Sequence, residues 1–339
     1  MDTAAAHRTL NRLLDAGLDR APEYGPGFST HLPMALQALH ALGASAQRLE
    51  DFAQQHVAEL QARPAPAPAA DARTWRALRG QAQVFEPLQA LFAQRLQDEE
   101  PDAVLADAVP ALLDGVAAGA FHGLIRTAHA VAARHEGELA MGLGYWAARH
   151  APLLQAPEAV DADLPLQAWL DQVRALRRPA GADADADAGS IGGRMQAWAR
   201  TEDFAHVAPR LALQPDTLDL LARTAAGLYA ATEDFTVLHM VTACQAMRQL
   251  APWWGDETAA LRHFSIAAAA ALRASDVPAE GPTDQPPVPA SDLAWPEIVR
   301  RAIASDDEHV VKLVQACRLH EAATRAPEFR QAAARAVGG

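Results

Sequence analysis

The sequence is almost without lysine: its 339 residues include 28 arginines and a single lysine, Lys312. Cysteine is equally scarce, and Cys244 and Cys317 cannot form a disulfide framework, so we expect a reducing, cytoplasmic environment. No apolar run approaches the ~18 residues of a membrane span, and the charged N-terminal segment lacks the apolar core of a signal peptide. These absences predict a protein with no membrane partner.

Basic clusters are also missing from the chain. The formal net charge is -13, the pI is about 5.4, and the arginines are scattered among acidic residues. Such a surface is unsuited to nucleic acid, which binds clustered positive charge. With 50% hydrophobic and 21% charged residues, the composition is typical of a globular protein with a large core.

Signals for β-strands are nearly absent, whereas helical periodicity continues from end to end. We therefore predict an all-α fold, a multi-helix, bundle-like single domain spanning 1–339 with a buried metal site between helices. Three segments rich in proline, glycine or aspartate are expected to be flexible linkers: 64–71, 179–192 and 277–292. The predicted helices are 3–18, 30–43, 45–62, 72–98, 102–118, 120–150, 165–177, 193–210, 215–230, 232–250, 256–274, 293–304 and 306–325.

Lys312 lies in an almost wholly apolar helical segment, three residues after His309. Residues three apart project from the same face of a helix, so both side chains should point to one place. Burial disfavours the charged amine, and a neutral amine can act as a base, a Schiff-base nucleophile or a carbamate precursor. The competing interpretation is a compositional preference for arginine, with Lys312 reaching solvent at its tip.

Three further histidines, His31, His122 and His239, lie in or next to other apolar helical segments. Each could be a hydrogen-bonded core residue, and His31 could simply stand at a helix entrance. Several isolated imidazoles on separate apolar helices are best reconciled by convergence on a metal inside a bundle. His129 shares a polar stripe with His122 and could replace one of these ligands.

Several common catalytic patterns are missing. The sequence has no paired Glu-x-x-His motifs, no His-Glu-x-x-His and no Cys-x-x-Cys. The segment 142–147 matches Gly-x-Gly-x-x-Ala in its letters, but it continues a helix and does not follow a strand, which argues against a dinucleotide site. A Gly-x-Ser-x-Gly elbow is also absent, so cofactor-free hydrolysis has no support.

Four ordered blocks of the chain resemble the questin oxidase-like family, helical proteins best known for oxidative opening of anthraquinone rings. The blocks are YGPGFSTHLPMALQALHALGA (24–44), GAFHGLIRTAHA (119–130), LHMVTACQAMRQL (238–250) and DEHVVKLVQA (307–316). The family has been described in two ways: as NADPH-dependent Baeyer-Villiger-type monooxygenases, and as non-haem iron oxygenases with four histidines and a carboxylated lysine.

The second description implies Fe(II) held by His31, His122, His239, His309 and the carbamate of Lys312. It also implies dioxygen and a small aromatic or quinone-type molecule as partners, with ring or carbon–carbon bond cleavage as the outcome. Arg126 and Gln245 are candidates for orienting a substrate oxygen, and Gln245 stands where relatives often carry another histidine. The alternatives are a Baeyer-Villiger-type enzyme with NADPH as the reductant and a non-catalytic helical binder of an apolar ligand.

Overall fold

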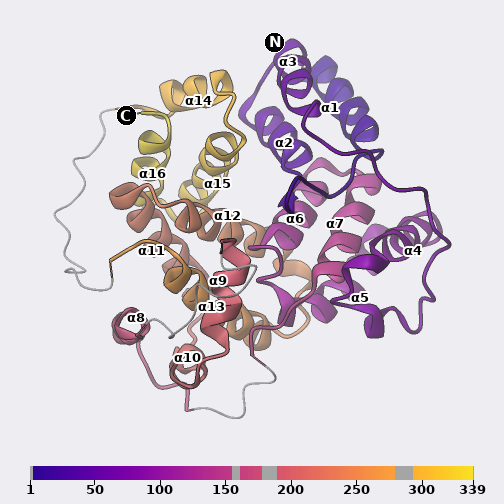
Figure 1. Ribbon diagram of the computed structural model, residues 1–339. Helices are drawn as coiled ribbons and strands as arrows, with labels where there is room; N and C mark the ends of the chain where they lie inside the picture. Colours follow the sequence, from indigo (N-terminus) through magenta and orange to yellow (C-terminus); the bar gives the residue numbers. More distant parts are fainter. Residues whose placement is uncertain (1–2, 155–160, 178–188, 279–292, 339) are drawn as a thin grey trace.

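The computed structural model describes residues 3–154, 161–177, 189–278 and 293–338. The all-α prediction is confirmed, because strands in the described part are limited to the short antiparallel pair β1 (Glu23–Tyr24) and β2 (Phe28–Ser29). The helices of the described part (Figure 1) are α1 (Thr3–Gly17), α2 (Leu32–Leu42), α3 (Ala46–Val57), α4 (Phe85–Asp98), α5 (Pro101–Leu112), α6 (His122–Ala133), α7 (Glu136–Arg149), α8 (Leu166–Ala175), α9 (Ile191–Ala199), α10 (Glu202–Val207), α11 (Thr217–Thr232), α12 (Phe235–Leu250), α13 (Glu257–Ala274), α14 (Trp295–Ala304), α15 (Glu308–Thr324) and α16 (Glu328–Ala336).

Three of the expected long helices are interrupted. The segment 193–210 divides into α9 and α10, which are separated by Arg200 and Thr201. In the segment 72–98, a continuous α-helix begins only at Phe85, after two short 3₁₀ turns. The segment 120–150 divides at Arg134, which adopts a left-handed conformation (φ 55°), and Nδ1 of His135 accepts a hydrogen bond from the backbone N–H of Glu138 to start α7. A histidine that caps a helix has no strong sequence signature, which explains the missed break. Helix α16 was not predicted.

Four helices, α2, α6, α12 and α15, pack in a closed ring in which each contacts two neighbours. In Figure 1 they meet in the middle of the molecule, with α2 from the N-terminal part and α15 from the C-terminal part. Side-chain caps start two of them: Asp234 accepts from the N–H of Val237 at α12, and Asp307 accepts from the N–H of His309 at α15. The ring therefore joins segments that are far apart in the sequence.

Helix α6 begins after an unusual turn. Gly119, Ala120 and Phe121 all have positive φ values, of 55°, 55° and 71°. For the two non-glycine residues this conformation costs about 1–2 kcal/mol each, and buried Phe121 packs against Phe264 with ring centroids 6.2 Å apart. This turn sets the direction in which His122, the first residue of α6, projects.

Glycine allows α6 and α7 to approach closely. A β-carbon at Gly123 would lie 2.7 Å from Cα of Trp146, so any side chain there would push the two helices apart. Buried apolar residues from α1 to α16 form one continuous cluster around these contacts.

Of the expected linkers, residues 64–71 are in neither helix nor strand, whereas most of 179–192 and 277–292 lie outside the described residues. No helix in the described part is both long and apolar enough to cross a membrane.

Candidate metal centre

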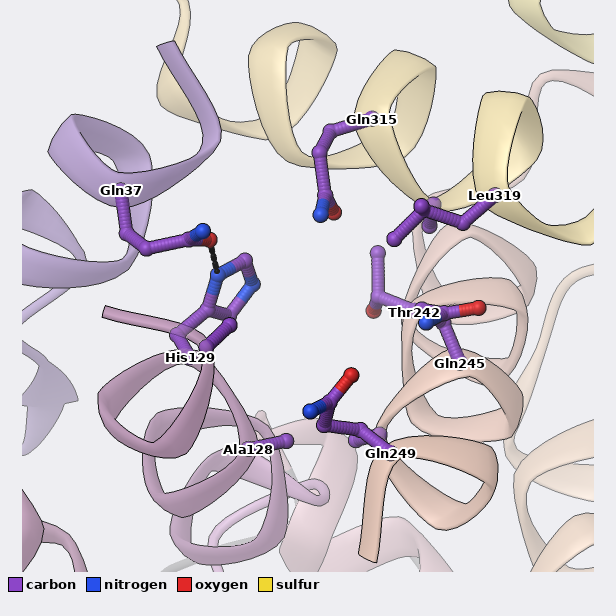
Figure 2. Close-up of a pocket in the computed structure, with 11 residues that line it drawn as sticks. Gln37, Ala128, His129, Thr242, Gln245, Gln249, Gln315 and Leu319 are labelled. Carbon is purple, nitrogen blue, oxygen red and sulfur yellow. Dashed lines mark hydrogen bonds between the residues drawn. The ribbon is translucent and has the colours of Figure 1, made fainter. Parts of the chain in front are cut away.

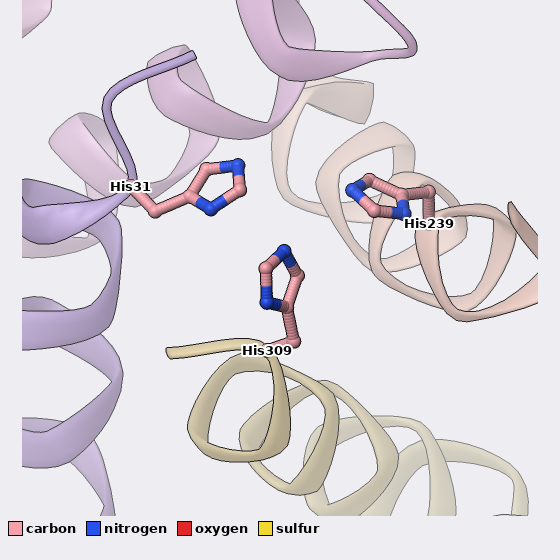
Figure 3. A group of neighbouring side chains, drawn as sticks. All are labelled: His31, His239 and His309. Atoms are coloured by element: carbon pink, nitrogen blue, oxygen red, sulfur yellow. The ribbon is translucent and has the colours of Figure 1, made fainter. Parts of the chain in front are cut away.

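The four ring helices bring four histidines together at their N-terminal ends. His31 stands just before α2, His122 begins α6, His239 is the fifth residue of α12, and His309 is the second residue of α15. Ring centroids are 4.6 Å apart for His31 and His122, 4.6 Å for His31 and His309, 5.0 Å for His122 and His239, and 5.6 Å for His239 and His309. Figure 3 shows three of these rings turned toward a common point, and their ligand nitrogens lie within 4.8 Å of one another.

All four rings are held by their Nδ1 atoms. Nδ1 of His239 donates to the carbonyl of Phe235 at 2.8 Å, and Nδ1 of His122 donates to the carbonyl of Gly119. Carboxylates hold the other two: Nδ1 of His31 lies 2.6 Å from Oε1 of Glu308, and Nδ1 of His309 lies 3.3 Å from Oδ1 of Asp307. Each neutral ring therefore keeps an unprotonated Nε2 free to bind a cation.

Two of the Nε2 atoms, those of His31 and His122, face each other without a donor between them. Nε2 of His31 and Nε2 of His122 are 2.6 Å apart, and the buried Nε2 of His309 has no hydrogen-bond partner among the described residues. Lone pairs that meet in this way need a proton or a metal ion between them. Burial makes a protonated, charged imidazole unfavourable. The nitrogen atoms therefore fit a divalent metal ion better than a proton.

Burial is the largest cause of the low basicity of these rings. It holds the pKa of His31, His122 and His239 well below 6.5, and neighbouring His and Lys312 charges lower it further. The pKa of His309 is also lowered, mainly by burial and against the opposing effect of Asp307. Neutral imidazole is the form that binds metals, so the site is in its binding form near neutral pH.

Lys312 lies beside the histidine cluster, and the prediction that it is buried is confirmed. Its exposed fraction is 3%, and it forms no hydrogen bond or salt bridge with another described residue. Burial lowers its pKa to about 8, although Glu308 and Asp307 act in the opposite direction. A charge on Lys312 lowers the pKa of every histidine in the cluster. A substantial neutral fraction of the amine therefore exists near pH 8.

Two features of the site were missed in the sequence, although they lie next to His309. Glu308 holds His31 from across the ring of helices, and Asp307 both caps α15 and contacts His309. Their signal was an acidic pair at a helix start, which usually means only capping and charge–dipole stabilisation. Phe235 packs on His239 and on His309 with centroids 4.7 Å from each, yet is 52% exposed, so it shields the rings from solvent.

Arg126 and Gln245 lie in different surroundings. The guanidinium of Arg126 makes a bidentate, buried salt bridge to Glu138, at 3.0 and 2.9 Å, and Nη1 has no partner among the described residues. Gln245 lines a small pocket together with His129 (Figure 2). His129 is bonded through Nδ1 to Oε1 of Gln37 at 2.6 Å, so it stands apart from the four clustered imidazoles.

The remaining candidate features from the sequence fall within the helical core. Gly142 and Gly144 lie inside α7, where added β-carbons would meet Thr127 and Gln89, so this motif serves helix packing. Cys244 and Cys317 are both free and buried.

The fold and the site together define a helical protein with four imidazoles and one buried lysine at the ends of four helices. The chain belongs to the questin oxidase-like family, whose sequence pattern it matches over residues 28–317. This match includes the four histidines and Lys312 and confirms the resemblance in the sequence. Family membership suggests an oxidase that acts on a small molecule of the anthraquinone type. No match was found among curated proteins.

Proposed function

We propose that the protein is a non-haem iron-dependent oxygenase that acts on an aromatic or quinone-type substrate and cleaves a ring or a carbon–carbon bond. The observation that supports this most directly is the convergence of imidazoles at the ends of α2, α6, α12 and α15: Nε2 of His31 faces Nε2 of His122, and ligand nitrogens of His31, His239 and His309 lie within 4.8 Å of one another. Nitrogen ligands with one anionic oxygen suit Fe(II) and related divalent ions. Bound Fe(II) would supply electrons and an open position for activating dioxygen.

Lys312 would supply the anionic oxygen as a carbamate. Its neutral amine adds to carbon dioxide, a carbon–nitrogen bond forms, and one proton leaves to solvent. Two conditions favour this reaction: the amine has a pKa of about 8, and the positive ends of the ring helices favour negative charge near their N-termini. The carbamate also explains why the chain buries a lysine that forms no salt bridge with a carboxylate of the described residues.

The other residues have positioning roles. Glu308 keeps the Nδ1 proton on His31 and raises the electron density at Nε2. Asp307 orients His309 in the same way, and the carbonyls of Gly119 and Phe235 fix the other two rings. Phe235 and the apolar helix faces limit the access of water, which protects reactive species from side reactions.

The test is dioxygen uptake by protein reconstituted with Fe(II), with 1,8-dihydroxyanthraquinone as substrate and ascorbate as reductant. We expect uptake coupled to loss of the quinone absorbance, and none with the chelator-treated protein. Uptake by metal-free protein that depends on NADPH would contradict the proposal and support a Baeyer-Villiger-type reaction. Absence of uptake with any divalent metal, despite ligand binding, would support a non-catalytic binder.

A further inference from the structure

The C-terminal end of α3 meets the N-terminal end of α15 beside the histidine cluster. His56 lies in the last turn of α3, and Glu308 is the first residue of α15. Nε2 of His56 lies 3.0 Å from the carbonyl oxygen of Asp306, two residues before Glu308. The negative end of α3 favours a cation and the positive end of α15 favours an anion, so each side chain suits the helix end that carries it.

Glu308 has an imidazole near each of its two oxygens. Oε1 lies 2.6 Å from Nδ1 of His31, and Oε2 lies 3.8 Å from Nδ1 of His56. The exposed fraction of the side chain falls from 21% for His56 to 16% for Glu308 and 9% for His31. The three side chains thus form a row that leads from the solvent-accessible edge to a metal-binding candidate in the interior.

The hydrogen bond at Nε2 determines what Nδ1 of His56 can do. A carbonyl oxygen only accepts, so Nε2 of His56 donates its proton to the carbonyl of Asp306. In the neutral ring Nδ1 is then an acceptor, and it lies 3.8 Å from another acceptor, Oε2 of Glu308. A second proton on the ring turns this pair of acceptors into an ion pair. His56 therefore gains an interaction with Glu308 when it becomes positively charged.

Arg48 fixes the start of α15 against α3. Its guanidinium donates to the carbonyls of Ile303 and Ser305, both at 2.6 Å, and to Oδ1 of Asp306 at 2.9 Å. Gln55 donates to the other carboxylate oxygen of Asp306 at 3.2 Å. These contacts do not involve the imidazole, so the two helix ends stay together whether or not that ring is charged.

The other titratable groups around this imidazole do not replace Glu308 as its partner. Asp306 already forms an ion pair with the guanidinium from α3, and Asp307 contacts a different imidazole of the cluster. Glu59 is exposed, so solvent and salt screen its charge. The hydroxyl of Tyr24 is neutral at ordinary pH, because burial and the charges of Glu308 and Glu59 raise its pKa.

An ordinary ion pair at the surface would have little consequence, because water screens it and two side chains must be ordered to form it. The pair of His56 and Glu308 differs in one respect. The same carboxylate holds Nδ1 of His31, whose side chain is almost fully buried. Negative charge on such a carboxylate strengthens the metal-binding nitrogen on the other side of the ring. A proton on His56 competes for that negative charge.

We propose that His56 is a positioning residue of the metal centre: a proton taken up at His56 draws the Glu308 carboxylate away from His31 and so lowers the affinity of the centre for a divalent metal. The proposal rests on the metal centre of the proposed function, with His31 as a ligand, but not on the oxidation carried out there. Histidine side chains change charge between pH 5 and pH 8, so the effect falls in this range. The coupling is reciprocal, so a bound metal favours loss of the proton from His56.

The test measures Co(II) affinity at pH 8 and at pH 6, in the unaltered protein and in the His56→Gln variant, by competition with a chromophoric chelator. The glutamine amide can still donate to the carbonyl of Asp306, but it takes up no proton. Affinity falls with pH in both proteins as the ligands take up protons, so the ratio of the two affinities isolates His56. We expect this ratio to shift about fivefold or more in favour of the variant at pH 6. A ratio that is the same at both pH values would overturn the proposal.

Two further variants show whether the effect passes through the carboxylate. His206→Gln, at an exposed position on α10, is the matched control, and its affinity relative to the unaltered protein should not change with pH. In a Glu308→Gln background, the addition of His56→Gln should shift the ratio little or not at all. A shift that persists in full without the Glu308 carboxylate would mean that His56 acts by another route, and the proposal would be wrong.

A second measurement needs neither metal nor a folded variant. Nitrogen-15 NMR of the chelator-treated protein follows the ring nitrogens of His31, which stays neutral between pH 8 and pH 6 because burial holds its pKa well below 6.5. These resonances should nevertheless move over this range as His56 takes up its proton, and stationary resonances would refute the coupling. The outcome is separable from the oxygenase test. Dioxygen uptake without the pH-dependent ratio contradicts only the role of His56, whereas the ratio without uptake contradicts only the oxygenase function.

Discussion

Oε1 of Glu308 lies 2.6 Å from Nδ1 of His31, while Nε2 of the same ring faces His122. This carboxylate–imidazole pair joins the start of α15 to the start of α2, across the ring of helices. A carboxylate in this position fixes the tautomer and strengthens a metal-binding nitrogen.

Glu308→Gln should therefore weaken metal affinity about 10- to 100-fold, because the amide keeps the shape but removes the negative charge. Competition with a chromophoric chelator measures this affinity. Glu202→Gln, at an exposed position on α10, should match the unaltered protein. A Glu308→Gln variant with undiminished affinity would mean that His31 does not bind the metal.

Lys312→Ala should remove most of the bound metal and the activity, because the carbamate oxygen is lost. Acetate or propionate can fill the vacated space and should restore part of both. Lys312→Arg should not, since a guanidinium stays charged and forms no carbamate. Carbon-13 NMR of protein equilibrated with labelled bicarbonate should show a carbamate resonance that is missing in Lys312→Ala. Identical spectra for the two proteins would refute the carbamate.

Acid should destabilise the metal-free protein in a defined range. In the unfolded chain the histidines take up protons near pH 6.5, but in the folded protein the pKa of His31, His122 and His239 lies well below that value. Below pH 6.5 the unfolded state thus binds more protons, so the free energy of unfolding falls with falling pH, by up to about 1.4 kcal/mol per pH unit for each group.

Thermal unfolding between pH 7 and pH 5 measures this effect. The melting temperature of the metal-free protein should drop through this range. The melting temperature of the His239→Gln variant should drop less steeply, because one histidine fewer takes up a proton on unfolding. A melting temperature that is constant from pH 7 to pH 5 would contradict the burial of neutral imidazoles.

Removal of the Arg126 charge alone should be costly. Arg126→Met leaves Glu138 buried without its cation, which destabilises by about 3–5 kcal/mol, whereas Arg126→Met with Glu138→Gln should recover most of that loss. Denaturant unfolding measures both. Turnover of the stable double variant then tests the role inferred for Arg126 from the sequence: a guanidinium that orients substrate predicts an inactive double variant, and a purely structural pair predicts an active one.

The sequence was informative where a polar side chain stands in an apolar helix, because burial of such a side chain needs a reason. Lys312 and His239 are polar residues in apolar helices, and that conflict predicted their burial and their common location. The turn before His122 was not predictable, because Ala120 and Phe121 have no local preference for positive φ and are held there by tertiary packing. Gln315 and Gln37 were also missed, since a glutamine in a helix usually faces solvent, and only the packed ring of helices shows that they line a pocket.

The most direct test of the metal centre is elemental analysis of protein purified without added metal. The four converging imidazoles and Lys312 predict about one iron per chain, and His239→Ala and His309→Ala should each retain less than about a tenth of it, as loss of one ligand from a small set implies. Folding of the variants is checked by circular dichroism. No metal above background in the unaltered protein, or full metal content in both folded variants, would contradict the account.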